Sequence, residues 1–299
     1  MKKICVMLST YNGQKYLKEQ LDSLLNQKNI DVTIMVRDDG STDGTQDILN
    51  EYKEKGVQWY QGENVRPAKS FLDLINSAPE TEYYAFCDQD DYWQENKLYA
   101  AVELMEKSNQ DNTKPVFYYS NVNVVDAQLN LINKSNIDKK GVDNIKRVMM
   151  SNSAIGCTVV MNKALIEQLK KAKPSYVYMH DWWAYAVCLA LGGKIVFDEN
   201  AYISYRQHGN NCLGFDKKKI DVKKAMFGKA DCLASRLAGQ LLQCYEADMD
   251  DSVKEDVKAL AYYKEKWSYK RKLLFDNSYY KTTGMQLLRE KISVLRNRK

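Results

Sequence analysis

Residues 83–91 read YYAFCDQDD, a short apolar run that ends abruptly in three carboxylates. Two earlier apolar runs also end in polar loops. Residues 4–8 are followed by STYNG at 9–13, and residues 32–36 are followed by RDDGS at 37–41. Short apolar runs bounded by turn-forming residues are typical of buried strands. We therefore expect three strands, each of which delivers a polar loop at its carboxyl end.

The segments between these runs have helical periodicity, so strands and helices alternate along the first half of the chain. The expected helices cover 16–27, 43–52, 67–76 and 94–107, and further strands cover 57–60 and 116–125. The middle adds strands at 155–161, 194–197 and 201–205 and helices at 163–171 and 181–191. Helical patterns follow at about 222–246, 252–275 and 284–297. This order predicts an α/β fold with a mostly parallel central sheet over residues 1–215, followed by a helical region over 216–299.

The composition is that of an ordinary globular protein. The 299 residues are 44% hydrophobic and 28% charged, with only 4 Pro and 14 Gly, which excludes a disordered or linker-rich chain. No apolar run reaches the roughly 18 residues of a membrane span. Seven scattered cysteines without metal-type spacing predict reduced thiols in a cytoplasmic protein. A net charge of +5 is too small to imply a nucleic-acid partner.

The basic residues are concentrated in the C-terminal region. Residues 264–299 hold 11 Lys and Arg against 3 Asp and Glu, whereas residues 1–215 have a slight acidic excess. Residues 264–272 interleave basic and aromatic side chains, and residues 285–298 form a basic amphipathic pattern. Such helices suit the surface of an anionic membrane leaflet, which would place the protein peripherally on the inner face of the cell membrane. The alternative is that their apolar faces pack on the α/β domain or on a second copy in a homodimer.

The three polar loops predict a ligand site, because ligands of open α/β sheets bind outside the carboxyl ends of the strands. Asn, Asp, Ser and Gly also form ordinary turns and helix caps, which explains any one of these loops. Three such loops at three strand ends favour the ligand site. The acidic loop is the strongest signal, since neighbouring carboxylates repel one another unless a cation compensates. Oxygen ligands of this kind suit a hard divalent ion that bridges a diphosphate.

In order and spacing, five motifs resemble those of the family 2 glycosyltransferases with the GT-A fold. They are STYNG at 9–13, DDGSTD at 38–43, DQDD at 88–91, HDWW at 180–183 and YRQH at 205–208. The resemblance covers about residues 1–215, and the DQDD and HDWW variants are similar to bacterial rhamnosyltransferases of cell-wall and O-antigen polysaccharide synthesis. It implies an inverting, metal-dependent enzyme that moves L-rhamnose from dTDP-rhamnose onto a hydroxyl of a growing, lipid-linked saccharide. A UDP-hexose donor is the alternative within the same fold.

The resemblance also implies roles for the residues of the donor site. Ser9, Tyr11 and either Asp38 or Asp39 would hold the nucleobase, and Lys69 would lie near the diphosphate. Asp88 would contact the ribose and the metal, Asp90 would be the main metal ligand, and His208 would complete the site for Mn²⁺ or Mg²⁺. The sequence departs from the family pattern at Arg66, where relatives often have Gly.

Asp181 is the candidate general base. It would accept the proton of the acceptor hydroxyl as that hydroxyl attacks the anomeric carbon. A carboxylate at a helix start can also be a simple N-cap. Trp182 and Trp183 could present apolar faces to the acceptor sugar, although we expect at least one of them to be core packing.

The sequence disfavours two other functional classes. A sugar-phosphate nucleotidyltransferase would need a Gly-rich basic loop near the N-terminus, and residues 9–13 contain no basic side chain. A binding module without catalysis would have no reason to combine Asp181 with the acidic loop. The absence of a GxxxxGK[ST] sequence also argues against a P-loop enzyme.

Overall fold

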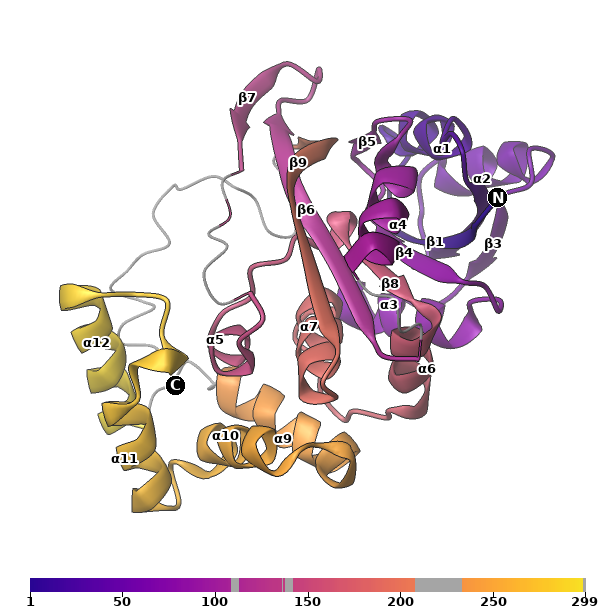
Figure 1. Ribbon diagram of the computed structural model, residues 1–299. Helices are drawn as coiled ribbons and strands as arrows, with labels where there is room; N and C mark the ends of the chain where they lie inside the picture. The colour runs from indigo at the N-terminus through magenta and orange to yellow at the C-terminus, as the bar shows by residue number, and fades with distance from the viewer. Residues whose placement is uncertain (109–112, 136, 138–141, 208–232, 298–299) are drawn as a thin grey trace.

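The computed structural model describes residues 1–108, 113–135, 137, 142–207 and 233–297. Within these residues a single sheet has the strand order β3-β2-β1-β4-β8-β6-β9-β5, with β7 paired to β6 (Figure 1). The strands are β1 Lys3–Thr10, β2 Asp31–Asp38, β3 Gln58–Gln61, β4 Tyr83–Cys87, β5 Tyr92–Trp93, β6 Val116–Val125, β7 Leu131–Lys134, β8 Val160–Asn162 and β9 Lys194–Arg206. The helices before the C-terminal region are α1 Leu17–Leu25, α2 Thr45–Lys53, α3 Arg66–Ser77, α4 Lys97–Ser108, α5 Ile145–Met150, α6 Lys163–Lys171 and α7 His180–Ala190.

The predicted α/β fold with a mostly parallel sheet is confirmed. β1 pairs in parallel with both β2 and β4, and β2 pairs in parallel with β3. The short strand β8 runs antiparallel between β4 and β6, and β6 pairs in parallel with β9. The first, second and fourth strands are therefore neighbours, and their carboxyl ends lie along one edge of the sheet.

Two predicted strand boundaries were wrong. Residues 155–161, expected as one strand, form a turn of 3-10 helix at Gly156–Thr158 before β8 begins. The runs at 194–197 and 201–205 are one continuous strand, β9, whose register against β6 shifts on either side of Asn121. The Asn121 side-chain amide donates to the Glu199 carbonyl at 2.9 Å and fills the irregularity, so the polar residues between the two runs do not end the strand.

Hydrophobic cores cover both faces of the sheet, which explains why its strands are continuous apolar runs. Alternate residues of β1 enter opposite cores: Cys5 and Met7 face one, and Ile4, Val6 and Leu8 face the other. The first core contains the apolar faces of α3, α5, α6 and α7. The second contains those of α1 and α4. The sheet is thus held rigidly between helices, and its loops rest on a fixed support.

Helices α9 Leu233–Tyr245, α10 Asp251–Tyr262, α11 Trp267–Phe275 and α12 Gly284–Leu295 continue the first core. In Figure 1, α9 and α10 lie beneath α5 and α7, and α11 and α12 lie to one side of α5. Lys146 of α5 joins the two regions through ion pairs to Asp256 at 3.4 Å and to Asp276 at 2.9 Å. The apolar faces of the C-terminal helices therefore pack in part on the α/β region. The expected boundary at residue 215 lies outside the described residues. None of the described helices combines the length and the apolar character required to cross a bilayer.

Candidate active site

The loops after β1 and β2 are joined by hydrogen bonds between residues about thirty positions apart in the sequence. The backbone amide of Asn12 donates to Ser41 Oγ, and that of Gly13 donates to Thr45 Oγ1, both at 2.8 Å. In return, the Thr42 amide donates to Asn12 Oδ1 at 2.9 Å. These contacts hold the two predicted loops in one fixed arrangement.

Gln89 attaches the acidic loop to the loop after β1. Its Oε1 accepts from Thr10 Oγ1 at 2.6 Å and from the Tyr11 amide at 2.8 Å, and its Nε2 donates to the Tyr11 carbonyl at 3.2 Å. Gly13 is packed against the contact between Gln89 and Thr10, because a Cβ at Gly13 would lie 2.5 Å from Gln89 Oε1 and 2.7 Å from Thr10 Oγ1. All three polar loops expected from the sequence thus form one connected wall.

A buried polar network lies on the side of the wall where the nucleobase residues are expected. Asp39 accepts hydrogen bonds from the Arg37 guanidinium and from Ser70 Oγ, the latter at 2.7 Å. Ser70 Oγ also shares a 2.7 Å hydrogen bond with Ser9 Oγ. Ser9 and Asp39 are therefore brought together through Ser70. Tyr11, by contrast, is exposed at the rim of the site.

Asp38 is also buried, and its partners are local. It accepts from the Ser41 amide at 3.2–3.3 Å, from the Ser41 hydroxyl, and from Gln46 Nε2 at 2.9 Å. Its carboxylate is thus engaged with its own turn. These contacts do not show which of Asp38 and Asp39 binds the nucleobase, so that role stays a prediction for both.

Lys69 lies in the first turn of α3, where its side chain is exposed. The same turn begins with Arg66, whose φ is +68°. A left-handed backbone carries a steric cost for any residue with a Cβ and almost none for glycine. Arg66, the residue that departs from the family pattern, therefore adopts a backbone conformation that glycine would adopt without steric cost.

The acidic loop brings Asp88 and Asp91 together with Cys157, such that one ligand atom of each lies within 4.8 Å of the others. Burial, together with the smaller effect of the charges of Asp90 and Asp181, raises the pKa of Asp88 to about 7. Asp91 is fully buried, and one of its oxygens accepts from the Arg206 amide at 3.1 Å. Burial and the neighbouring carboxylates raise the pKa of Asp91 well above its ordinary value.

This donor set suits an oxygen-coordinated divalent ion at the outer part of the loop. Asp88 and Asp90 are half-buried and carry the carboxylate oxygens that Mg²⁺ and Mn²⁺ prefer. Cys157 fits less well, because burial raises the pKa of its thiol and keeps it protonated. Asp91 is held by the backbone of β9. His208, the expected third ligand, lies outside the described residues, so its position is not defined.

Asp181 lies in the first turn of α7 and is almost fully buried. Its Oδ1 accepts from the Trp182 amide at 2.7 Å, and its Oδ2 accepts from Asn152 Nδ2 at 3.0 Å. Met179, not Asp181, occupies the N-cap position, although Asp181 accepts one backbone N–H of the first turn. Burial outweighs these hydrogen bonds and raises the pKa of Asp181 to about 6. The base candidate lies near the acidic loop, because Gly156 is beside Asp181 Oδ2 and the next residue, Cys157, lies beside Asp88 and Asp91.

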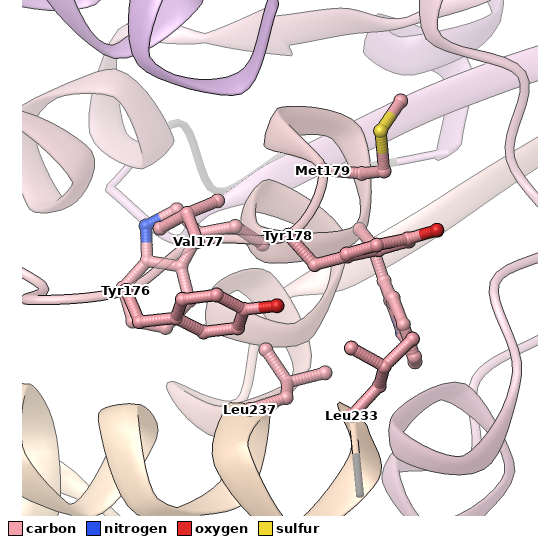
Figure 2. A pocket seen from close by; sticks show the side chains of 8 residues that line it. Tyr176, Val177, Tyr178, Met179, Leu233 and Leu237 are labelled. Atoms are coloured by element: carbon pink, nitrogen blue, oxygen red, sulfur yellow. The ribbon is translucent and has the colours of Figure 1, made fainter. Parts of the chain in front are cut away.

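The two tryptophans differ in their surroundings. Trp183 is buried and packs near Tyr245 of α9, with ring centroids 6.1 Å apart, which makes it a core residue. Trp182 donates from its indole N–H to the Val148 carbonyl at 2.6 Å. Both line a small apolar pocket between the start of α7 and α9 (Figure 2). The remaining lining residues are Tyr176, Val177, Tyr178, Met179, Leu233 and Leu237.

Sequence reasoning missed the residues that support this site. Arg206 is buried at the end of β9, where it forms an ion pair with Glu19 and donates from Nε to the Asp90 carbonyl at 2.8 Å. Asn152 and Cys157 reach the site from the segment between α5 and β8. Only Arg206 carried a signal, because it falls inside the quoted YRQH motif. The other two stand far from their partners in the sequence and belong to no quoted motif.

Comparisons with known proteins identify the family of this chain. The family model described as Glycosyl transferase family 2 matches residues 5–169, more than half of the chain. The dTDP-rhamnosyl transferase RfbG of Shigella flexneri is 27% identical over 225 residues, which cover 69% of this chain and 73% of that protein. The glucosyltransferase WfaP of Escherichia coli, named for transfer from UDP-Glc to GlcNAc-diphosphoundecaprenol, is 29% identical over 40% of this chain and 46% of its own length.

Solved structures show the same fold. Residues 1–349 of S. aureus TarS in complex with UDP-GlcNAc superpose with a TM-score of 0.62 at 19% identity, covering 99% of this chain and 80% of that one. The mannosyltransferase PcManGT of Pyrobaculum calidifontis, bound to GDP-Man and Mn²⁺, gives a TM-score of 0.52 at 16% identity, covering 99% and 88%. At these identities the likeness concerns the fold alone. The chain belongs to glycosyltransferase family 2 and is a glycosyltransferase with the GT-A fold.

Proposed function

We propose that this enzyme is an inverting, metal-dependent glycosyltransferase that moves L-rhamnose from dTDP-rhamnose onto a hydroxyl of a growing, lipid-linked cell-surface polysaccharide. The observation that carries the chemistry is the proximity of Asp181 to the acidic loop. Asp181 has a pKa raised to about 6, close to the range in which a general base works well at neutral pH. A Cβ at Gly156 would lie 3.7 Å from Asp181 Oδ2, and the next residue, Cys157, lies beside Asp88 and Asp91, which supports a site shared by the base and the loop.

The reaction is a single displacement at the anomeric carbon. The acceptor hydroxyl oxygen forms the new bond to that carbon while the bond to the diphosphate oxygen breaks, and Asp181 takes the hydroxyl proton. Asn152 holds Asp181 Oδ2, which orients the carboxylate toward one direction of attack. Asp88 and Asp90 would hold a divalent ion, which when bound neutralises charge on the leaving diphosphate.

We propose that the nucleobase binds beside the buried network of Ser9, Ser70 and Asp39. A carboxylate suits the imide N–H of thymine or uracil. RfbG is named as a dTDP-rhamnosyl transferase, and the names of WfaP and of the TarS complex contain UDP-sugars. A rhamnosyl donor is supported by the first of these, which matches over the greater share of this chain.

A thermal-shift screen of nucleoside diphosphates with Mn²⁺ or Mg²⁺ tests the donor. We expect dTDP with metal to raise the melting temperature more than UDP, GDP or ADP. A larger shift with UDP would replace the rhamnosyl donor with a UDP-hexose and keep the transferase. No shift with any pyrimidine diphosphate would contradict the proposed nucleotide site.

We also propose that the two regions of the chain have different roles. Residues 1–215 form the catalytic domain, and the helical region 216–299 docks the enzyme on the inner face of the cell membrane, where a lipid-linked acceptor lies. Large apolar side chains on α11 and α12 remain exposed, including Trp267, Phe275, Met285, Leu288 and Leu295. Basic residues accompany them, and Lys270 Nζ lies 5.8 Å from the centre of the Trp267 ring. Apolar and cationic groups together fit an anionic lipid surface.

A further inference from the structure

The segment between α11 and α12, residues 276–283, holds the start of α5. The Ser278 carbonyl accepts from Nδ2 of Asn144, the N-cap residue of α5, at 3.4 Å. Lys146 in the first turn of α5 donates to Asp276 Oδ2 at 2.9 Å. The C-terminal region therefore fixes the position of α5 through side chains and backbone together.

Lys281 of the same segment reaches the loop that follows α5. Its Nζ donates to the Ser151 carbonyl at 3.3 Å and to Ser153 Oγ. Ser151 is the C-cap residue of α5, and Asn152 lies between the two serines. One ammonium group thus bridges the residues on either side of Asn152.

Asn152 connects this loop to the proposed base. Its Oδ1 accepts from the Ala154 amide at 3.0 Å, and its Nδ2 donates to Asp181 Oδ2 at 3.0 Å. The other oxygen of Asp181 accepts from the Trp182 amide of the same helix, so Asn152 holds the carboxylate from a different element. Because the donor and acceptor ends of a side-chain amide are rigidly joined, the position of the loop decides where the Asn152 N–H points.

The contact of Lys281 is expected to influence rate more than stability. Lys281 is exposed, and a hydrogen bond at the surface contributes little to the free energy of unfolding, since water replaces it in the unfolded chain. Catalysis is more sensitive, because misplacement of a reacting group by about 1 Å lowers a rate by up to about 100-fold.

We propose that Lys281 is a positioning residue for the general base, which acts through the loop at residues 151–154 and Asn152 on the carboxylate of Asp181. The proposal rests on the proposed function, because it concerns the orientation of Asp181 as the base. It gives the C-terminal region a role in the chemistry, since a side chain beyond α11 completes the support of a residue at the start of α7.

The test measures release of nucleoside diphosphate from the nucleotide-sugar that wild type uses best, with Mn²⁺ and without acceptor. Water then takes the place of the acceptor hydroxyl and gives its proton to Asp181. We expect Lys281→Met to lower kcat about 5- to 30-fold. The KM for the nucleotide-sugar should stay within about twofold of wild type, and the melting temperature should be unchanged. Lys281→Arg, which retains donors for the Ser151 carbonyl and Ser153 Oγ, should recover most of the rate.

A double-substitution cycle with Asn152→Ala shows whether Lys281 acts through Asn152. The single substitution Asn152→Ala should itself lower kcat, because it removes the hydrogen bond to Asp181 Oδ2. When Asn152 is absent, the position of the loop no longer affects the carboxylate. Adding Lys281→Met to Asn152→Ala should therefore lower kcat by less than about twofold more.

Lys291→Met is the matched control. Lys291 on α12 donates to Asn277 Oδ1 within the C-terminal region, so this variant removes the same charge without touching the loop. Its kcat should equal that of wild type. Four results would overturn the proposal: wild-type kcat in Lys281→Met, an equal fall in Lys291→Met, independent effects of Lys281→Met and Asn152→Ala that multiply, or a fall in kcat accompanied by a lower melting temperature and a raised KM. Absence of release by wild type, or wild-type release by Asp181→Asn, would instead contradict the proposed function, and this proposal with it.

Discussion

At the scale of single residues, Asp181 is a buried carboxylate that accepts hydrogen bonds from two neighbouring residues. Its carboxylate accepts from the Trp182 amide and the Asn152 side chain, and these bonds do not offset the loss of solvation. A fully hydrogen-bonded carboxylate would be a weak base, whereas a pKa of about 6 preserves basicity and still allows ionisation at neutral pH. This pKa suits the base that we propose Asp181 to be.

The pH dependence of transfer follows from this pKa. Because the base acts when deprotonated, we expect the rate to fall as pH decreases through about 6. Asp181→Asn should lower the rate by about 10²–10⁴-fold and remove this acid limb. The transfer rate of both proteins, measured as a function of pH, tests both expectations. A wild-type rate that is flat between pH 5 and 8, or an Asn variant of near-normal rate, would exclude this role.

The same substitution has the opposite effect on stability. The native pKa is raised above the ordinary value of 3.8, so the contribution of this group to stability is fully present below that value and is lost as pH rises through about 6. At pH 8 the ionised carboxylate disfavours the fold. Asp181→Asn should therefore keep or raise the melting temperature at pH 8, which distinguishes lost chemistry from lost structure.

The sequence predicts where the residues of the quoted motifs lie in the fold, but it does not predict which distant residues contact them. Asp88, Asp90 and Asp181 follow from local motifs at the end of a strand or the start of a helix. Asn152 and Cys157 act on residues 29 or more positions away, and nothing in a single sequence encodes such a contact. The burial of Asp38 and Asp39 was also hidden, because turn residues and ligand-binding residues share the same composition.

At the scale of elements, the active site is a set of loops fastened to one another. Gln89 secures the acidic loop against Thr10 and Tyr11, and Asn12 joins the first loop to the second. Each loop therefore depends on its neighbours for its position. Strand and helix positions in this part of the chain were predictable from apolar periodicity.

The substitution Gly13→Ala tests whether these loops hold one another in position. The added methyl group would collide with Gln89 Oε1 at 2.5 Å, so we expect a loss of about 1–3 kcal/mol in the free energy of unfolding. Nucleoside diphosphate affinity should fall as the loops separate. Denaturant unfolding measures the first effect, with Gly239→Ala on α9 as the control, where nothing lies within 4 Å of the new Cβ. That control should gain about 0.5–1 kcal/mol through helix propensity. Equal stability of Gly13→Ala and wild type would contradict the account.

The order and direction of the later strands could not be predicted. β8 has three residues and runs antiparallel between β4 and β6, and so short a run carries no signal for its partners. β9 was split in two because polar residues at 198–200 resemble a turn, although Asn121 of the neighbouring strand pairs with them. Pairing across the sheet, not local propensity, decides these features.

At the scale of the whole molecule, the C-terminal helices have one face in the core and another in solvent. Leu260, Tyr263, Leu273 and Tyr279 are fully buried in the core that α7 shares. Trp267 and Phe275 are 62% and 79% exposed. The two alternatives that the sequence left open are therefore compatible, since packing uses one set of side chains and leaves another available. Removing the tail would expose the core, so point variants are the proper test.

Binding to lipid vesicles tests the membrane proposal. We expect co-sedimentation with anionic but not neutral vesicles, weakened by salt, since each basic residue near the surface contributes about 1 kcal/mol. The double substitution Trp267→Ser with Phe275→Ser should reduce binding at least tenfold without lowering the melting temperature. Ile132→Ser on β7, where Ile132 is 60% exposed, is the matched control and should bind like wild type. Equal recovery in the supernatant with both vesicle types would remove the membrane role.

The central claim is that the acidic loop and Asp181 form a metal-dependent centre for nucleotide-sugar chemistry. Release of nucleoside diphosphate from dTDP-rhamnose or a UDP-hexose, measured with Mn²⁺ and with EDTA, tests it most directly. We predict release by wild type with Mn²⁺, none with EDTA, and none by Asp90→Ala in either condition. Asp31→Ala, which removes an exposed carboxylate at the opposite end of β2, should match wild type. Equal release by wild type in EDTA and in Mn²⁺, or normal release by Asp90→Ala, would contradict the account.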